Sequence, residues 1–204
     1  MILGLTRTLQ RQPLTGVESE EVLRVLAERT EALARLVERL EAAVEAGLTE
    51  WANVTDLVDE VAAAHPRVQV EGPDVAVMTT LNRTAGVRIL LELVENALAF
   101  SPPEEPVVVQ VRAGEDHVEV RVVDHGCGVD PSAVARIFDP LEQGEDLLTR
   151  THPGAGWGLS LARLSARAMD GDVTLESTGP HGSVFLWRLA AAGVRLVPRA
   201  LTAT

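Results

Sequence analysis

Residues 83–128 read RTAGVRILLELVENALAF, SPPEEP, VVVQVRAGEDHVEVRVV and DHGCG in succession. The first segment predicts a strongly apolar helix, which ends at the serine and two prolines because the residue before a proline disfavours the helical conformation. The third segment predicts two strands, 107–112 and 117–123, joined by a hairpin turn. A glycine-rich turn then follows the second strand directly.

The sequence on both sides of this stretch adds further helices and strands. Helices are predicted at 54–64, near 131–137 and at 156–169, and strands at 67–71, 75–77, 173–177 and 183–189. This order of helices and largely antiparallel strands predicts an α+β sandwich, in which one sheet is covered on one face by helices.

Apolar residues recur in heptads upstream of this region. They form two interleaved rows, namely Leu23, Thr30, Val37 and Val44 in one and Leu26, Leu33 and Leu40 in the other. Such rows form the seam of a coiled coil or helical bundle. A shorter helix at 2–12 and a turn at 13–16 precede them, which favours an antiparallel helical hairpin over a single surface helix. The predicted organisation is a hairpin domain at 1–50, a larger domain at 51–192 and a C-terminal tail at 193–204.

The composition of the 204 residues excludes several classes of function. A net charge of −12 argues against a surface that binds nucleic-acid phosphates. All 18 basic residues are arginine, so the lysine that a P-loop requires is absent. The single cysteine excludes an internal disulfide and a zinc site built from cysteines. No apolar run approaches the roughly 18 residues of a membrane span, and we expect no membrane segment in this chain.

Glu92 and Asn96 lie four residues apart in the predicted apolar helix and therefore share one face. A carboxylate and a carboxamide in this position suit a hard cation such as Mg²⁺. A helix-capping or solvated pair is an equally good explanation of these two residues alone.

Two glycine-rich stretches are candidate ligand sites. After the strand 117–123, Asp124 is followed by Gly126 and Gly128, so a carboxylate that can accept a hydrogen bond from an exocyclic amine adjoins backbone that a ligand can approach. An ordinary Asp-Gly turn is the alternative. A second series, Gly154, Gly156 and Gly158, opens a helix, where free amide groups can bind an anion. A dinucleotide-binding fingerprint would instead follow a first strand.

In their order and spacing these motifs resemble the GHKL ATPases, specifically bacterial sensor histidine kinases. Residues 92–102 resemble the N box, Asp124, Gly126 and Gly128 the first glycine box, residues 137–140 the phenylalanine box, and Gly154, Gly156, Gly158 and Leu159 the second glycine box. The resemblance covers about residues 52–190. It implies a Bergerat fold, a two-layer α+β sandwich of a mostly antiparallel sheet and helices, preceded by the α-helical hairpin of a dimerisation domain.

The resemblance also implies roles for these residues. Asn96 would bind Mg²⁺ that bridges the ATP phosphates, and Asp124 would accept a hydrogen bond from the adenine amino group. Residues 141–153 would form a lid over the phosphates, with the second glycine box as its hinge. Many members carry a basic residue where this sequence has Ala99, and Arg150 is the expected replacement. Glu92 would act as a catalytic helper or in the Mg²⁺ shell.

The function that the resemblance implies is transfer of the ATP γ-phosphoryl group to a histidine, for relay to the receiver domain of a response regulator. No histidine precedes His65, so we expect this chain to begin just past the acceptor histidine and to be unable to autophosphorylate alone. We expect a homodimer through the hairpin in the full protein, no nucleic-acid partner and a cytoplasmic location, either free or as part of a membrane-bound sensor. The alternatives are a non-enzymatic dimeric pseudokinase scaffold and a stand-alone anti-sigma-type serine kinase switch.

Overall fold

The structure is a computed structural model that describes residues 49–139, 158–190 and 193–199, all within the compact unit Glu41–Thr204. The predicted helices at 2–12 and 18–46 and the predicted lid lie outside the described residues. The described elements, in chain order, are β1 (Glu50–Asn53), α3 (Val54–Ala63), β2 (Val68–Glu71), β3 (Ala76–Leu81), α4 (Arg83–Phe100), β4 (Val107–Ala113), β5 (His117–Val123), α5 (Gly158–Arg167), β6 (Asp172–Gly179), β7 (Gly182–Ala190) and β8 (Arg195–Val197).

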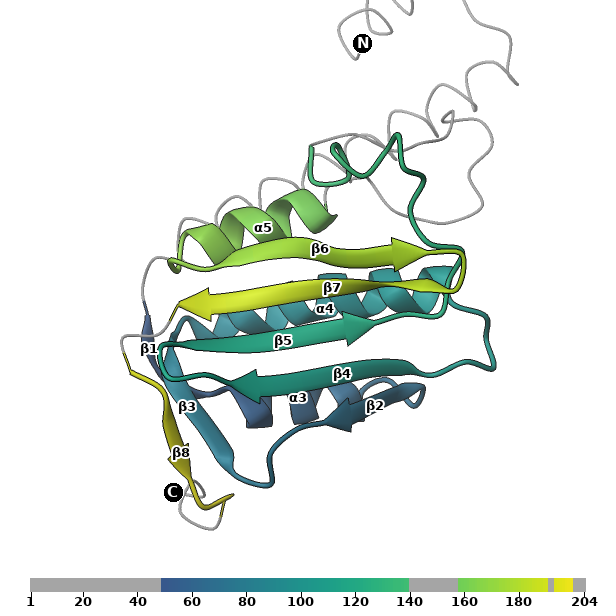
Figure 1. Ribbon diagram of the computed structural model, residues 1–204. Coiled ribbons are helices and arrows are strands. Elements are labelled where there is room, and N and C mark those ends of the chain that lie inside the picture. Colours follow the sequence, from purple (N-terminus) through teal and green to yellow (C-terminus); the bar gives the residue numbers. More distant parts are fainter. Residues whose placement is uncertain (1–48, 140–157, 191–192, 200–204) are drawn as a thin grey trace, which may run out of the picture. The chain divides into compact units, whose positions relative to one another are not determined.

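Five strands form the main sheet in the order β2-β4-β5-β7-β6. The predicted hairpin of strands 107–112 and 117–123 is confirmed, because β4 pairs with β5 in antiparallel fashion. The predicted strands 173–177 and 183–189 lie within β6 and β7, which form a second antiparallel hairpin. The central strands β5 and β7 are also antiparallel, and only β2 joins β4 in parallel. Helices α3, α4 and α5 all lie on one face of this sheet (Figure 1). The predicted two-layer α+β fold is thereby confirmed.

A second sheet of three strands has the order β1-β3-β8. The sequence analysis predicts β3 but neither of its neighbours, which pair with it in antiparallel fashion. β1 reads EWAN and β8 reads RLV, and neither alternates apolar with polar residues as a half-buried strand does. Part of the predicted tail after residue 193 therefore forms a strand of this sheet.

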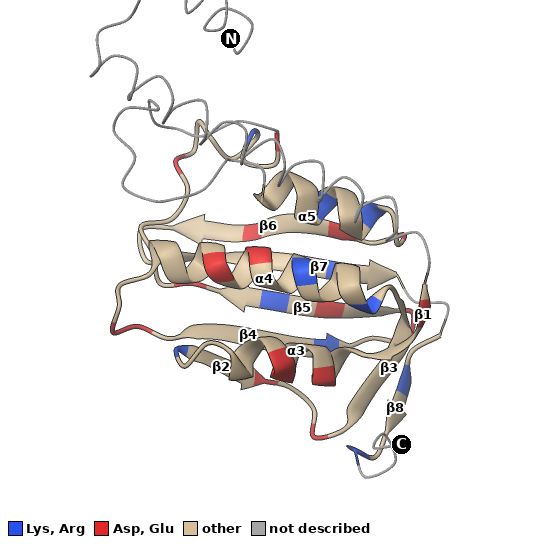
Figure 2. Cartoon of the chain, turned by 180° about the vertical axis from the view of Figure 1, so that it is seen from behind, with Lys and Arg blue, Asp and Glu red and all other residues tan. Residues whose placement is uncertain are grey.

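Helix α4 covers the residues predicted for it. Its N-terminus is capped by Asn82, whose side chain accepts a hydrogen bond from the Ala85 N–H at 2.9 Å. Its C-terminus is Phe100, followed by Ser101 and the two prolines. One side of the helix is buried along its whole length. Figure 2 shows acidic residues in red on both α3 and α4, and Asp56, Glu60 and Glu95 among them are exposed.

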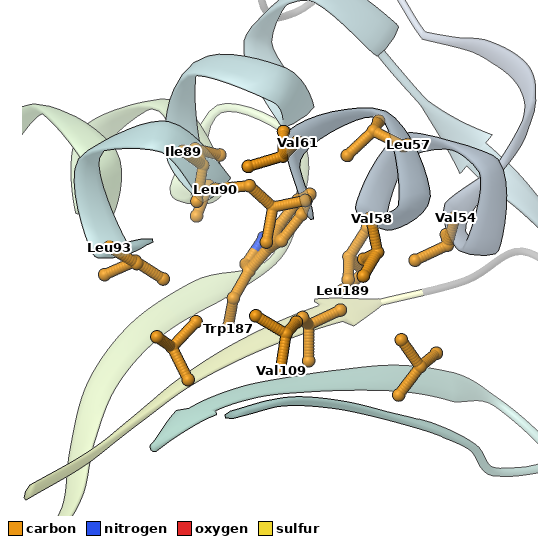
Figure 3. Close-up of a cluster of buried hydrophobic side chains, with 14 of the residues drawn as sticks. Val54, Leu57, Val58, Val61, Ile89, Leu90, Leu93, Val109, Trp187 and Leu189 are labelled. Atoms are coloured by element: carbon orange, nitrogen blue, oxygen red, sulfur yellow. The ribbon is translucent and has the colours of Figure 1, made fainter. Parts of the chain in front are cut away.

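The core lies between the helices and the five-stranded sheet. Figure 3 shows the ring of Trp187 rising from β7 among apolar side chains of α3 and α4, including Val61 and Leu90. Trp187 is fully buried, and the same core includes residues of α5 and of the small sheet, such as Ala162 and Leu81.

The helix predicted near 131–137 is wrong. The segment forms successive turns, with N–H groups of Ala133, Val134, Arg136 and Ile137 bonded three or four residues back. The Asp130 side chain accepts hydrogen bonds from the backbone N–H and hydroxyl of Ser132. These local bonds lower the pKa of Asp130, the one from the hydroxyl most strongly. Most residues of the segment are exposed, so no buried apolar stripe stabilises a regular helix here.

Candidate functional site

Asp124 lies directly after β5, and its carboxylate is held by backbone. Oδ1 accepts hydrogen bonds from the N–H of Gly126 at 2.8 Å and of Ser183 at 3.0 Å. The Asp124 N–H in turn donates to the Ser183 carbonyl at 3.0 Å. The residue is only 6% exposed. Within the described part of the chain every hydrogen bond of this carboxylate goes to Oδ1, so Oδ2 remains an unused acceptor in a fixed position.

Gly126 and Gly128 bring the turn after Asp124 against two neighbouring segments. A Cβ at Gly126 would lie 2.6 Å from the carbonyl oxygen of Phe100, at the end of α4. Gly128 has a φ of 76°, and a Cβ there would overlap the carbonyl oxygen of Gly179. The close approach that these glycines permit in this structure is therefore to protein backbone. Contact with a nucleotide at either position stays a prediction.

Hydroxyl groups from both neighbouring segments hold the same turn. Ser101 Oγ accepts a hydrogen bond from the His125 N–H at 3.1 Å, and Thr178 Oγ1 accepts one from the Val129 N–H at 2.7 Å. Thr178 Oγ1 also lies 3.0 Å from Ser183 Oγ. The sequence analysis singles out none of these hydroxyl residues. The only signal for them is their position beside turns, where serine and threonine commonly bond backbone.

Asn96 and Glu92 lie on α4 as predicted, and both are half-buried. Asn96 is one helical turn before Phe100, so the contact between Phe100 and Gly126 brings the Asp124 turn to the end of the helix that carries Asn96. The Asn96 carboxamide makes no hydrogen bond to any residue that the structure describes. A half-buried carboxamide without a protein partner is available to a ligand.

Glu92 of the N box lies beside Gly158 of the second glycine box. A Cβ at Gly158 would overlap Glu92 Oε2, so this carboxylate lies against the first residue of α5. A negative charge is favourable at a helix N-terminus because the unpaired amide groups there are partly positive. Leu159 is partly buried against the core. Arg150, Gly154 and Gly156 lie outside the described residues.

The phenylalanine box packs beside α5. Ile137 and Phe138 are partly buried against the core, and the Phe138 ring lies 4.7 Å from the Arg163 guanidinium. Arg163 also donates to Asp172 at the start of β6, with Nε 2.9 Å from Oδ1. Burial alone would raise the pKa of Asp172, but the hydrogen bonds from Arg163 and Arg167 outweigh it and hold this pKa below its usual value.

The chain matches a known family over the part that carries these features. The family model described as "Histidine kinase-, DNA gyrase B-, and HSP90-like ATPase" matches residues 82–193, from the N-cap of α4 to beyond β7. More than half of the chain is therefore covered by one family.

Individual relatives agree with the family match. The chain is 27% identical over 207 residues to the sensor-like histidine kinase SenX3 of Mycobacterium tuberculosis, covering 93% of this chain and 50% of that protein. It is 32% identical over 123 residues to the sensor histidine kinase RcsC of Escherichia coli, covering 60% and 13% respectively. The chain thus spans about half the length of SenX3 and a small part of RcsC.

Solved structures show the same fold. Full-length ShkA, crystallised in complex with AMPPNP, aligns with a TM-score of 0.64 at 25% identity over 94% of this chain and 43% of that chain. The mycobacterial sensor histidine kinase MprB aligns with a TM-score of 0.59 at 19% identity over 72% of this chain and 99% of that chain. The curated relatives that the chain resembles are sensor histidine kinases, and the chain itself belongs to the histidine kinase-, DNA gyrase B- and HSP90-like ATPase family.

Proposed function

We propose that this region binds Mg-ATP and transfers its γ-phosphoryl group to a histidine on a dimerisation domain. The observation that carries the proposal is the carboxylate of Asp124, which is buried and fixed through Oδ1 by two backbone N–H groups. Its free Oδ2 accepts but does not donate, which suits the exocyclic amino group of adenine. The specificity of the site for ATP over GTP follows from this acceptor, because guanine has a carbonyl oxygen at that place.

Asn96 would hold the Mg²⁺. The described residues contain no group of three or more His, Cys, Asp or Glu side chains that could bind a metal. Mg²⁺ at a phosphate site needs only one or two protein ligands besides the phosphates and water. The Asn96 carboxamide, which has no hydrogen-bond partner among the described residues, fits that requirement. When bound, the ion neutralises charge on the phosphates during transfer. Glu92 would assist from the same helix, as a catalytic helper or in the shell of the ion.

The phosphates would lie toward the N-terminus of α5. Gly158 is the first residue of this helix, and free amide groups at a helix N-terminus bind anions. Gly154, Gly156 and Arg150 would extend this phosphate site from the lid, and Leu159 would support it from within α5.

The partners and domain boundaries belong to the same proposal, supported by the sensor histidine kinases to which the chain is similar. Residues 1–50 would form part of the dimerisation hairpin, residues 51–192 the ATP-binding domain, and residues 193–204 a C-terminal segment that adds strand β8 to the small sheet of that domain. The full protein would act as a cytoplasmic homodimer or as the cytoplasmic part of a sensor, and would pass the phosphoryl group to a response regulator. None of the described helices has the length and apolar character to span a bilayer.

Titration calorimetry with Mg-ATP tests the nucleotide site. Asp124→Asn keeps an oxygen for the Gly126 and Ser183 N–H groups but places an amide donor where adenine requires an acceptor. We expect this variant to stay folded and to bind Mg-ATP at least about tenfold more weakly, which corresponds to a loss of about 1.4 kcal/mol. Asp116→Asn is the matched control, because Asp116 is an exposed residue of the β4–β5 turn. Equal affinities for all three proteins would contradict the adenine assignment.

Intact-mass spectrometry after incubation with Mg-ATP tests the transfer. The chain is mixed with a separately produced dimerisation domain of a sensor histidine kinase that contains its acceptor histidine. We expect the added domain, and not this chain, to gain a phosphoryl group. Bound nucleotide without any transfer would favour the pseudokinase scaffold, and transfer to a serine of a partner would favour the switch-kinase alternative.

A further inference from the structure

Arg67 lies just before β2, and its half-buried side chain donates to three backbone carbonyl groups. Nε and Nη2 lie 3.3 Å and 2.9 Å from the Glu105 oxygen. Nη2 also donates to the Pro102 oxygen, and Nη1 lies 3.5 Å from the Leu98 oxygen. The Arg67 carbonyl accepts a hydrogen bond from the Val107 N–H at 3.0 Å. One residue thus holds the chain from the last turn of α4 to the start of β4.

The three carbonyls lie at and after the end of a helix, and the Pro102 oxygen also accepts a hydrogen bond from the Glu105 N–H at 3.1 Å. The last carbonyl groups of a helix have no partner within the helix, and Leu98 is in the last turn of α4. Pro102 and Glu105 belong to the α4–β4 connection, residues 101–106, which has no regular secondary structure. A guanidinium has five donors in a fixed plane and a permanent positive charge, which is favourable at a helix C-terminus. A single lysine ammonium cannot reproduce this set of directions.

The opposite side of the α4–β4 connection holds the turn after Asp124. Ser101 Oγ accepts from the His125 N–H, and the Pro106 oxygen lies 3.0 Å from His125 Nδ1. The Phe100 oxygen lies against Gly126. The connection therefore has Arg67 on one side and the first glycine box on the other, and it follows directly on the helix that carries Asn96.

We propose that Arg67 is a positioning residue of the nucleotide site. Its guanidinium fixes the α4–β4 connection, and the connection fixes the backbone of His125 and Gly126 relative to the end of α4. The distance between the adenine acceptor on Asp124 and the Mg²⁺ ligand on Asn96 thereby depends on a residue that touches neither. The inference rests on the proposed function for the identity of the ligand, and its contacts are all within the protein.

Three variants test the role of Arg67. Arg67→Met removes the guanidinium but keeps an apolar stem, and Arg67→Lys keeps the charge but reaches fewer carbonyls. Arg83→Met is the matched control, because Arg83 starts the same helix, is exposed and pairs with the side chain of Glu60. Mg-ATP affinity is measured by calorimetry well below each melting temperature, together with hydrogen exchange of the amides of residues 124–128.

We expect Arg67→Met to bind Mg-ATP about tenfold more weakly and Arg67→Lys to lie between it and the wild type. Amide exchange at residues 124–128 should be faster in Arg67→Met than in the wild type, whereas exchange of the paired β6 and β7 amides should be unchanged. In Arg83→Met the exchange rates at residues 124–128 should equal those of the wild type. If Arg67→Met does not fold, the Mg-ATP affinity and amide exchange of Arg67→Lys are compared with those of the wild type instead.

A lower melting temperature with unchanged affinity and unchanged exchange at 124–128 would show a merely structural role and overturn the inference. An equal loss of affinity in Arg83→Met would also overturn it, because the effect would then follow from charge alone. If the wild type itself binds no Mg-ATP, the proposed function fails. The exchange comparison still decides whether Arg67 holds the turn after Asp124.

Discussion

Gly182 has a φ of 129°, and a Cβ at this position would overlap the carbonyl oxygen of Asp124 and lie 3.0 Å from the His125 Cα. L-residues with side chains rarely adopt this conformation. The β6–β7 turn can therefore lie directly on the backbone of the Asp124 turn only while residue 182 has no side chain. This glycine is required by the packing of the protein itself, independently of any ligand.

Gly182→Ala should lower the free energy of unfolding by about 2 kcal/mol or more, because both the backbone angle and the contact with Asp124 are unfavourable. Urea denaturation measures the change. Gly179→Ala is the matched control in the same turn, since a Cβ at Gly179 meets nothing within 4 Å, and we expect it to change the stability by no more than about 0.5 kcal/mol. Equal destabilisation by both variants would show that the close approach at residue 182 is unimportant.

The candidate ligand-binding residues are easier to pick out from the sequence than the residues that hold them in place. Asp124 and Asn96 are polar residues in patterns that neither a core nor an ordinary turn requires. Ser183 donates its N–H to the Asp124 carboxylate, but the sequence does not predict this contact because the two residues are 59 positions apart in the chain. Its position depends on the pairing of β5 with β7, and the spacing of residues along the chain does not contain that pairing.

Elements with strong local signals are predicted with accurate ends. α4 has 18 residues, a continuous buried side, a capping Asn82 and prolines after its last turn. Segment 131–137 has a comparable start signal in Asp130 and Pro131, and Asp130 accepts a hydrogen bond from the Ser132 N–H as a capping residue would. The residues that follow are mostly exposed. A start signal therefore predicts a helix only where a buried apolar stripe follows it. The edge strands β1 and β8 depend on pairing with β3, which is a non-local interaction.

Asp172 joins two elements, because it is the first residue of β6 and receives hydrogen bonds from two arginines of α5. Arg167 Nε lies 3.1 Å from Oδ1, in addition to the contacts of Arg163. Arg163 also lies under the Phe138 ring. One carboxylate with a lowered pKa therefore joins α5 to the start of β6, in addition to the buried residues Leu161, Ala162 and Ala166 of the helix.

Asp172→Asn should lower the stability by no more than about 1 kcal/mol at neutral pH, because a third of the Asp172 side chain is exposed and solvent screens its ion pairs. The pKa of Asp172 is lower in the folded than in the unfolded state, so its contribution is present above pH ~4. That contribution is lost as the pH falls through the folded-state value.

The measurement is the urea midpoint as a function of pH. The difference between the wild type and Asp172→Asn should narrow steadily below pH ~4. Asp170→Asn is the control with the same change of charge, two residues away at an exposed position whose φ of 57° asparagine tolerates. A difference that is the same at all pH values, or that Asp170→Asn reproduces, would show that the ion pairs of Asp172 contribute nothing.

The two sheets share one core. At Gly86 of α4, an added Cβ would lie 2.8 Å from Leu81 Cδ1 of β3, 3.0 Å from Leu57 Cδ1 of α3 and 3.2 Å from Trp187 Cη2 of β7. Both sheets and two helices therefore meet over a residue without a side chain. We expect the described part of the chain to unfold as one cooperative unit, since residues of both sheets belong to the same buried apolar cluster.

Native-state hydrogen exchange of Trp187 variants tests this cooperativity. Trp187→Ala should lower the stability by about 3–5 kcal/mol, and Trp187→Phe by less, because it keeps an aromatic ring and removes an Nε1–H that has no hydrogen-bond partner among the described residues. The opening free energies of the β3 and β5 amides should fall together, by the same amount in each variant.

Trp51→Phe is the control, because Trp51 is 47% exposed and its ring centroid lies 5.0 Å from the Arg195 guanidinium. We expect it to lower the free energy of unfolding by about 1 kcal/mol at most. Weakening of β5 with unchanged exchange in β3 would show instead that the small sheet is stable on its own.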